Sequence, residues 1–297
     1  MATEREGITT SEFEDGLFAL TGATEFKNIM LYGGPGAGKT VLAGSVPGRI
    51  LFLAGEPGYI SAARLGAKGV ARLIPDSATA VAAAAWLEDG NASKFDFVIT
   101  DGLGTIQNKA LLSYAAEAWD ANPAKRTHRN LPDKPDYFNA QNFIKSWVAR
   151  IIDLPVHTIF TAHAMFPEDK ETGDQLVYPA IQGKGYEVST YVCGMMHAVG
   201  YMSPRIKMTE EGPVQVRRVL WETTKDPKTE TTYFAKDQFN ALGQFTDVER
   251  GKMMMPEILS VIDSGKQNEA PAAVVVQQES AKPAKRAPAG RRAPARR

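Results

Sequence analysis

The sequence predicts an α/β fold in which helices flank a mainly parallel central sheet. Short apolar runs at 28–32, 49–54, 95–101 and 156–163 are typical of strands that are buried on both faces. Stretches with helical spacing lie between these runs, and alternation of strands with helices favours a parallel sheet. A glycine-rich turn directly after the first run also points to this class, because it sits where a buried strand passes into a helix.

The glycine-rich turn reads GGPGAGKT and satisfies the pattern GxxxxGK[ST] of a phosphate-binding loop. Glycines let successive N–H groups turn inward around a phosphate, and the helix expected from about Lys39 adds its dipole. Lys39 is expected to reach the β- and γ-phosphates of ATP, and the Thr40 hydroxyl to ligate Mg²⁺. The alternative is a turn that only joins strand to helix. The expected nucleotide-binding residues are Gly33, Gly34, Pro35, Gly36, Ala37, Gly38, Lys39 and Thr40.

The run at 49–54 is bounded on both sides by Pro-Gly pairs and reads as a second buried strand, with Glu56 at its carboxyl end. The next elements expected are a helix over 59–65, a strand over 70–74 and a helix capped by Ser77 that ends near 87.

The run at 95–101 ends in Asp101, which is the Walker B pattern of apolar residues followed by an acid. Apolar strands often end in a turn-forming Asp, so the pattern alone is weak. After a complete phosphate loop, it predicts that Asp101 holds Mg²⁺ directly or through water.

Two helices are expected over 104–119 and 137–152, with a long connector over 122–135 between them. The connector is a candidate loop for nucleic acid or another partner, and the alternative is a solvated excursion between helices. Its cations, taken as candidate DNA contacts, are Lys125, Arg126, Arg129 and Lys134.

The run at 156–163 returns the chain to the sheet and ends in His163. A hairpin with a charged tip is expected over 165–180. The remaining elements expected are strands within 191–202, 214–222 and 231–234, and a closing helix over 251–264.

The last residues differ in composition from the rest, because from 266 they are rich in Ala, Pro, Gln and Arg and are expected to be disordered. They suit sequence-independent contact with phosphates but lack aromatic side chains for stacking, and a solubilising tail is the alternative. The expected organisation is a lead-in over 1–27, an ATPase domain over 28–265 and this basic tail over 266–297. The tail's cations, all candidate DNA contacts, are Lys282, Lys285, Arg286, Arg291, Arg292, Arg296 and Arg297.

Composition excludes several classes of protein. The content of 43% hydrophobic and 23% charged residues is ordinary for a soluble globular chain of 297 residues. Cys193 is the single cysteine, so an internal disulfide is impossible, and its apolar neighbours indicate a small buried side chain. The acidic start lacks a signal-peptide pattern, and no run is long enough to span a membrane, so a cytoplasmic protein is expected.

Four groups are expected at the carboxyl edge of the sheet, where ligands bind in open α/β folds: the phosphate loop, Glu56, Asp101 and His163. Glu56 is the candidate for positioning the attacking water, and its alternative is an exposed turn acid. His163 is a candidate contact to the γ-phosphate, and its alternative is a structural histidine at a strand end.

The order of these elements resembles the RecA-like core of the P-loop NTPases, and most closely the short bacteriophage RecA-like proteins, namely the Sak-type single-strand annealing ATPases and their RadA-like relatives. The resemblance covers about residues 26–245. It includes the segment YFAKDQF at 233–239, similar to the family's lysine, acid, Arg, Phe pattern. Gln238 stands where Arg is common, so no trans-acting role is assigned to it.

The resemblance implies that Glu56 is the hydrolytic glutamate, Asp101 the Walker B acid and His163 the polar sensor. It implies an ATP- and Mg²⁺-dependent protein that binds single-stranded DNA in annealing or strand exchange, together with a single-strand-binding protein. A ring or filament of identical subunits, in the cytoplasm of a host cell if the protein is phage-encoded, is implied as well. Candidates for a trans-acting cation are Lys184, Arg205 and Lys207.

Two other functions remain open from the residues. One is a nucleotide-gated loader or adaptor with slow turnover. The other is a small-molecule kinase, which is disfavoured because no Arg-rich lid is evident; Arg205, Arg217 and Arg218 lie among expected strands.

Overall fold

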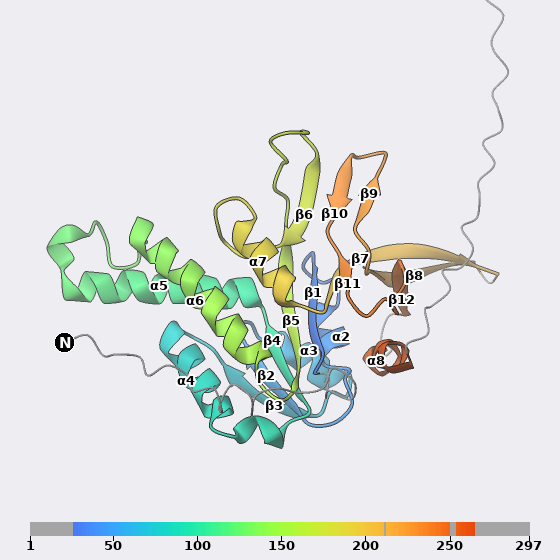
Figure 1. The fold of residues 1–297 in the computed structure, drawn as a ribbon, viewed down its shortest axis with the longest axis horizontal. Helices are drawn as coiled ribbons and strands as arrows, with labels where there is room; N and C mark the ends of the chain where they lie inside the picture. Colours follow the sequence, from blue (N-terminus) through green and yellow to red (C-terminus); the bar gives the residue numbers. More distant parts are fainter. Residues whose placement is uncertain (1–25, 211, 250–253, 265–297) are drawn as a thin grey trace, which may run out of the picture.

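A computed structural model describes residues 26–210, 212–249 and 254–264 (Figure 1). Nearly all of the expected lead-in, the start of the expected closing helix, and the whole basic tail with its seven candidate DNA-binding cations lie outside the described residues.

The core of the fold is a parallel sheet, as the sequence predicts. Its strands follow one another across the sheet in the order β7-β1-β5-β4-β2-β3, and every adjacent pair is parallel. Strand β1 lies where the strand order reverses, which is the usual place of a ligand site in this class. The bounds are β1 (Asn28–Gly33), β2 (Ile50–Ala54), β3 (Gly69–Leu73), β4 (Phe97–Asp101), β5 (His157–Met165) and β7 (Ala198–Thr209).

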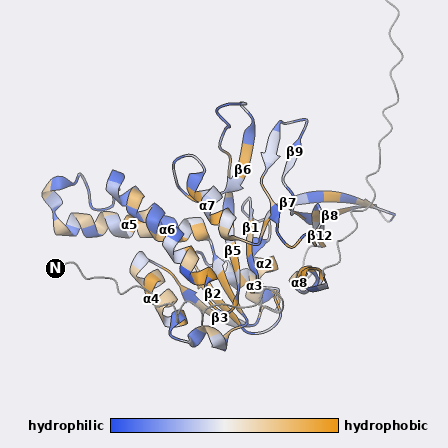
Figure 2. Cartoon of the chain, in the orientation of Figure 1, coloured by the Kyte–Doolittle hydropathy of each residue, from blue (hydrophilic) through white to orange (hydrophobic). Residues whose placement is uncertain are grey.

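Helices cover both faces of this sheet, because its inner strands are apolar on both sides. Along β1, Met30 and Tyr32 pack into one core, whereas Ile29 and Leu31 pack into the other. The first core is completed by α4 (Ser77–Glu88), α5 (Leu103–Ala121), α6 (Lys134–Ile152) and α7 (Glu187–Met195). The second is completed by α2 (Lys39–Ala43), α3 (Tyr59–Arg64) and α8 (Met255–Ser264). Figure 2 shows the hydrophobic residues concentrated on the central strands and a hydrophilic turn between α5 and α6.

Antiparallel strands extend the sheet beyond β7, which confirms the predicted late strands. Strand β8 (Gly212–Leu220) pairs with β7 in a long hairpin, β12 (Phe245–Glu249) pairs with β8, and the short β11 (Lys236–Asp237) pairs with β7. A small side sheet stands above the carboxyl ends of the core strands (Figure 1). It contains β6 (Gln175–Pro179), β9 (Thr224–Asp226) and β10 (Thr231–Tyr233). Two 3₁₀ helices, η1 (Asn91–Lys94) and η2 (Pro123–Lys125), complete the described elements.

One predicted strand is partly wrong. The sequence favours a strand from 191, but α7 continues to Met195 and β7 begins only at Ala198. The buried residues Val188 and Val192 are one helical turn apart and face the first core, so packing selects the helix. A short apolar run does not distinguish between the two structures by itself.

The cap of α4 is a smaller correction. Asp76, and not Ser77, is the N-cap residue, and its Oδ1 accepts the Thr79 N–H at 2.7 Å. Ser77 is buried within the first turn.

Two other expectations are confirmed. The hairpin expected over 165–180 is the antiparallel pairing of β5 with β6. Cys193 is fully buried, and burial raises the pKa of its thiol to about 12. No described helix is both long and apolar enough to cross a bilayer.

Candidate functional site

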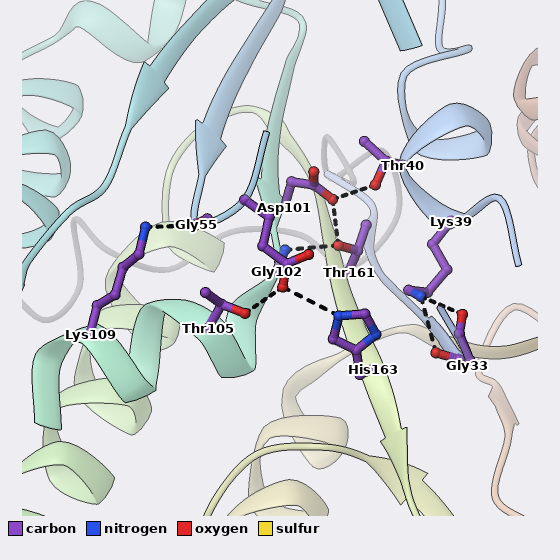
Figure 3. Close-up of polar contacts among 12 residues, drawn as sticks. Gly33, Lys39, Thr40, Gly55, Asp101, Gly102, Thr105, Lys109, Thr161 and His163 are labelled. Carbon is purple, nitrogen blue, oxygen red and sulfur yellow. Dashed lines mark hydrogen bonds and ion pairs between the residues drawn. The ribbon is translucent and has the colours of Figure 1, made fainter. Parts of the chain in front are cut away.

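The phosphate loop leaves the carboxyl end of β1 and enters α2, as the motif predicts. Gly36 and Gly38 have φ angles of 73° and 98°, a left-handed backbone that glycine adopts without strain. Lys39 is buried, and its Nζ donates to the carbonyls of Gly33 at 3.0 Å and Gly34 at 2.9 Å (Figure 3). Burial lowers the pKa of Lys39, and the nearby Glu56 and Asp101 carboxylates oppose this effect. The lysine is therefore held against the loop that it is expected to serve.

Asp101 is the last residue of β4 and accepts hydrogen bonds from two threonines, one on α2 and one on β5. Its Oδ1 accepts hydrogen bonds from Thr40 Oγ1 and Thr161 Oγ1, each at 2.7 Å (Figure 3). Thr161 Oγ1 also accepts the Gly102 N–H at 2.9 Å, so one hydroxyl orients both the carboxylate and the turn that follows it. Burial raises the pKa of Asp101, and these two hydrogen bonds oppose that shift.

The residues around Asp101 fit a magnesium ion. Mg²⁺ takes oxygen ligands, and here a hydroxyl and a carboxylate meet beside the phosphate loop. Asp101 Oδ2 is buried and has no hydrogen-bond partner in the described part of the chain. A buried carboxylate oxygen without a partner is costly unless a cation or water meets it. Thr40 and Asp101 are the residues that would hold the ion.

Glu56 and His163 lie together in the same site. Glu56 Oε1 is 3.3 Å from His163 Nε2, and it also accepts a hydrogen bond from Thr105. The Nδ1 atom of His163 is buried without a hydrogen-bond partner among the described residues. Both side chains remain partly exposed, at 35% for Glu56 and 41% for His163. The two strand-end groups predicted from sequence therefore interact with each other.

Two side chains of helix α5 form hydrogen bonds to the residues that follow β2. Lys109 Nζ donates to the carbonyl of Gly55 at 2.6 Å (Figure 3). It also donates to the carbonyl of Ile74 at 3.1 Å, and the Thr105 hydroxyl donates to Glu56. Thr105 and Lys109 are four residues apart, so they face the same side of the helix. This spacing was the available signal for them, but sequence reasoning missed both residues, and missed Thr161 as well.

These groups line a cavity of about 430 Å³ that contains the phosphate loop, Glu56, Asp101 and His163. Arg217 of β8 lines the same cavity, a contribution that the sequence did not reveal. A larger cavity of about 610 Å³ lies between β3 and α4, but its lining is mainly apolar and includes Leu51, Val70 and Trp86. The smaller cavity holds the charged and glycine-rich groups that phosphate chemistry needs, so it is the candidate site.

The four cations predicted as DNA contacts in and beside the connector between α5 and α6 differ in whether they form ion pairs. Arg126 pairs with Asp136 and, at 3.2 Å, with Asp133, whereas Arg129 pairs with Asp120 at 2.7 Å. Lys125 and Lys134 are exposed and show no ion pair with any described residue. Two of the four predicted DNA contacts are thus engaged with acids of the same chain. Asp136 also stabilises the start of α6, because its carboxylate accepts the Asp133 N–H at 2.8 Å in a capping box.

Comparison with known proteins shows which family the chain belongs to. Residues 25–239 match the model of a family described as an AAA domain. No curated protein matches the chain.

Solved structures with a similar arrangement share little sequence with this chain. The assembled ATPase EscN of the enteropathogenic E. coli type III secretion system is 13% identical, with a TM-score of 0.36, over 60% of this chain and 43% of its own. A KaiC-like protein from Pyrococcus horikoshii is 12% identical, with a TM-score of 0.33, over 66% and 80%. The flagellar accessory protein FlaH from Methanocaldococcus jannaschii is 10% identical, with a TM-score of 0.32, over 71% and 85%. Neighbours this distant carry no information on substrate or partner.

Proposed function

This chain belongs to the AAA domain family, and from that premise we propose that it is a Mg²⁺-dependent ATPase whose nucleotide cycle acts on single-stranded DNA. Membership of this family makes the chain an ATPase of the AAA class. The magnesium dependence, the DNA and the residue roles are the proposal. We take 28–265 as the unit that carries the activity.

The observation that carries the proposal is the pairing of Thr40 with Asp101 in one cavity with Glu56. Thr40 Oγ1 and Asp101 Oδ1 are 2.7 Å apart, and Glu56 lines the same cavity as the phosphate loop. Phosphoryl transfer to water needs cradled phosphates, a metal ion and a group that orients the water. Each of these has a candidate here.

The proposed roles follow from these contacts. The loop N–H groups and Lys39 bind the phosphates, which requires the Lys39 ammonium to exchange its loop carbonyls for phosphate oxygens. Glu56 orients the attacking water and accepts its proton. Thr40 and Asp101 would hold Mg²⁺, which would neutralise charge on the phosphates. His163 contacts Glu56 and lies on β5, which pairs with β6 directly after it. We therefore assign to His163 the role of transmitting the state of the nucleotide from the site to β6.

The proposed DNA contact uses exposed cations outside this cavity. Lys125 lies on the connector between α5 and α6, and Lys134 is the first residue of α6; the connector projects from the body of the molecule (Figure 1). The basic tail adds a second set of cations. Contacts of this kind bind the phosphate backbone without reading its sequence. We extend the proposal to a homo-oligomer in which Lys184, Arg205 or Lys207 acts on the neighbouring subunit's nucleotide.

Measuring ATP hydrolysis with and without single-stranded DNA tests the proposal. We expect Glu56→Gln to keep ATP binding and to reduce hydrolysis by about 10²- to 10⁴-fold, because the water loses its base. We expect single-stranded DNA to stimulate the wild-type rate, and a Lys125→Gln, Lys134→Gln variant to reduce that stimulation. Absence of stimulation together with absence of DNA binding at low salt would exclude the DNA part. Unchanged hydrolysis in Glu56→Gln would exclude the assigned role.

A nucleotide-gated loader is the second candidate, and one contact favours it. Thr105 and His163 both engage Glu56, which keeps its carboxylate occupied and suits slow turnover. For such a protein, Glu56→Gln changes little, and binding of a partner depends on whether ATP or ADP is present. The same variant therefore distinguishes the two functions.

A further inference from the structure

Arg217 reaches the phosphate loop from outside the parallel core. It lies on β8, which is antiparallel to β7 and separated from β1 by that strand. Its neighbours in the sheet are Pro204 on β7 and Val248 on β12. Nevertheless, its side chain lines the cavity that contains Lys39 and Asp101.

The approach of Arg217 to the loop is close and depends on a glycine. A Cβ atom at Gly38 would lie 1.8 Å from Arg217 Nη1 and 2.9 Å from Cζ. The guanidinium therefore lies directly over the Cα of Gly38, in space that any other residue would fill. The contact is within one chain, so it needs no neighbouring subunit.

The adjacent arginine shows that this orientation is specific to position 217. Successive side chains of a strand point to opposite faces, so Arg218 faces away from the cavity. Its guanidinium pairs with Asp247 at 2.7 and 2.9 Å and lies 3.7 Å from the Phe245 ring centroid. Arg218 is directed to the far face of the strand, and Arg217 is directed into the nucleotide cavity.

The charges that line the cavity favour a second cation for binding a polyphosphate. Lys39 is opposed by two carboxylates, Glu56 and Asp101, so without Arg217 the fixed charges would be net negative. A polyphosphate carries several negative charges and binds poorly to such a site. Arg217 brings the count of cations level with the count of carboxylates. Its planar fork is also suited to bidentate contact with phosphate oxygens.

We propose that Arg217 is a phosphate-contacting residue that binds the nucleotide in the same subunit that carries the loop. This inference rests on the proposed nucleotide site. It assigns a second cation to that site, from a strand that the motif does not include.

Nucleotide affinity of charge-removing variants tests the inference. Arg217→Met and Arg217→Gln keep most of the side-chain stem and remove the charge. We expect both to bind fluorescent ATP and ADP analogues about 10- to 100-fold more weakly than wild type, because each loses a charge-assisted contact. Arg217→Lys should recover part of that loss. Arg218→Gln is the matched control and should bind as wild type does, since its partner is Asp247.

Each outcome decides between phosphate contact and simple packing on Gly38. Wild-type affinity in either folded charge-removing variant would overturn the inference. If both variants also melt at lower temperature without nucleotide, Arg217→Lys decides: recovery of binding supports the contact, and no recovery overturns it. The wild-type protein and Lys39→Ala separate this inference from the proposed function. A wild-type chain that binds no nucleotide rejects both, whereas wild-type binding that Lys39→Ala abolishes and Arg217→Gln preserves rejects Arg217 alone.

Discussion

At the residue scale, Thr161 is the side chain that joins the parts of the candidate metal site. It is buried, and its hydroxyl donates to Asp101 and accepts from the Gly102 N–H. It precedes His163 by two positions on β5, so both side chains lie on the same face of that strand. Thr161 is thus a positioning residue for the carboxylate rather than a ligand of the phosphates.

Replacing Thr161 by Val is expected to destabilise the protein by about 1–3 kcal/mol. The substitution keeps the shape but removes one of the two hydrogen bonds to Asp101 Oδ1 and leaves the buried Gly102 N–H without its acceptor. Chemical denaturation measures the stability, and titration of Mg²⁺ in the presence of ATP measures the metal affinity, which should also fall. Thr161→Ser, which retains the hydroxyl, is the control. Stability and metal affinity in Thr161→Val equal to those of wild type would show that the hydroxyl positions nothing.

At the element scale, contacts at the start of α6 show that part of the predicted DNA-binding connector stabilises the fold. Asp136 is buried in the first turn of α6, where it accepts the Asp133 N–H and pairs with Arg126. Burial alone would raise the pKa of Asp136, but these contacts lower it. The pair joins the connector to the helix and positions the exposed Lys125 and Lys134 beside it.

Two aspartates of this region should differ sharply on substitution. Asp136→Ala removes the buried partner of Arg126 and the N3 half of the capping box of α6, so we expect the melting temperature to fall by several degrees. Asp120→Ala removes the exposed pair with Arg129 and should change the melting temperature little. Thermal unfolding followed by circular dichroism makes the comparison. Equal effects of the two changes would contradict the structural role of Asp136.

At the scale of the whole molecule, the strand order brings the functional groups to one edge. Strand β5 lies between β1 and β4, so Thr161 stands between the phosphate loop and Asp101. Strand β2 follows β4, which brings Glu56 within reach of His163. Groups from these four parallel strands then share one cavity with Arg217 of β8, while the connector and the hairpin of β7 and β8 project from the body (Figure 1).

Deleting 266–297 is expected to weaken binding to single-stranded DNA and to flatten its dependence on salt. Fewer cations on the protein release fewer counterions from the DNA, so the slope of log affinity against log salt becomes shallower. ATP binding should remain, because the residues that line the nucleotide cavity, from Pro35 to Arg217, all precede the deleted segment. Titration of a labelled oligonucleotide at several salt concentrations measures the slope. A tail with its seven cations changed to Gln is the control for length, and an unchanged slope would exclude the tail from DNA binding.

Much of the site could be predicted because strand-end groups depend on local patterns. Gly33 to Thr40, Glu56, Asp101 and His163 each follow a short apolar run, and parallel strands bring such positions to one edge. The helix over Glu187–Met195 could not be predicted in the same way. Its apolar residues fit either structure, and packing of Val188 and Val192 into the core decided between them.

By itself, the sequence determined the fold class and the phosphate loop, because both depend on the local order of apolar runs and glycines. Only the tertiary structure decided which other side chains meet that loop. Arg217 and Thr161 are far from Gly38 and Asp101 along the chain, and Arg126 shows no sequence signal of its pairing with Asp136. Such contacts depend on strand order, on the direction of β8 and on helix packing, which no local pattern of residues encodes.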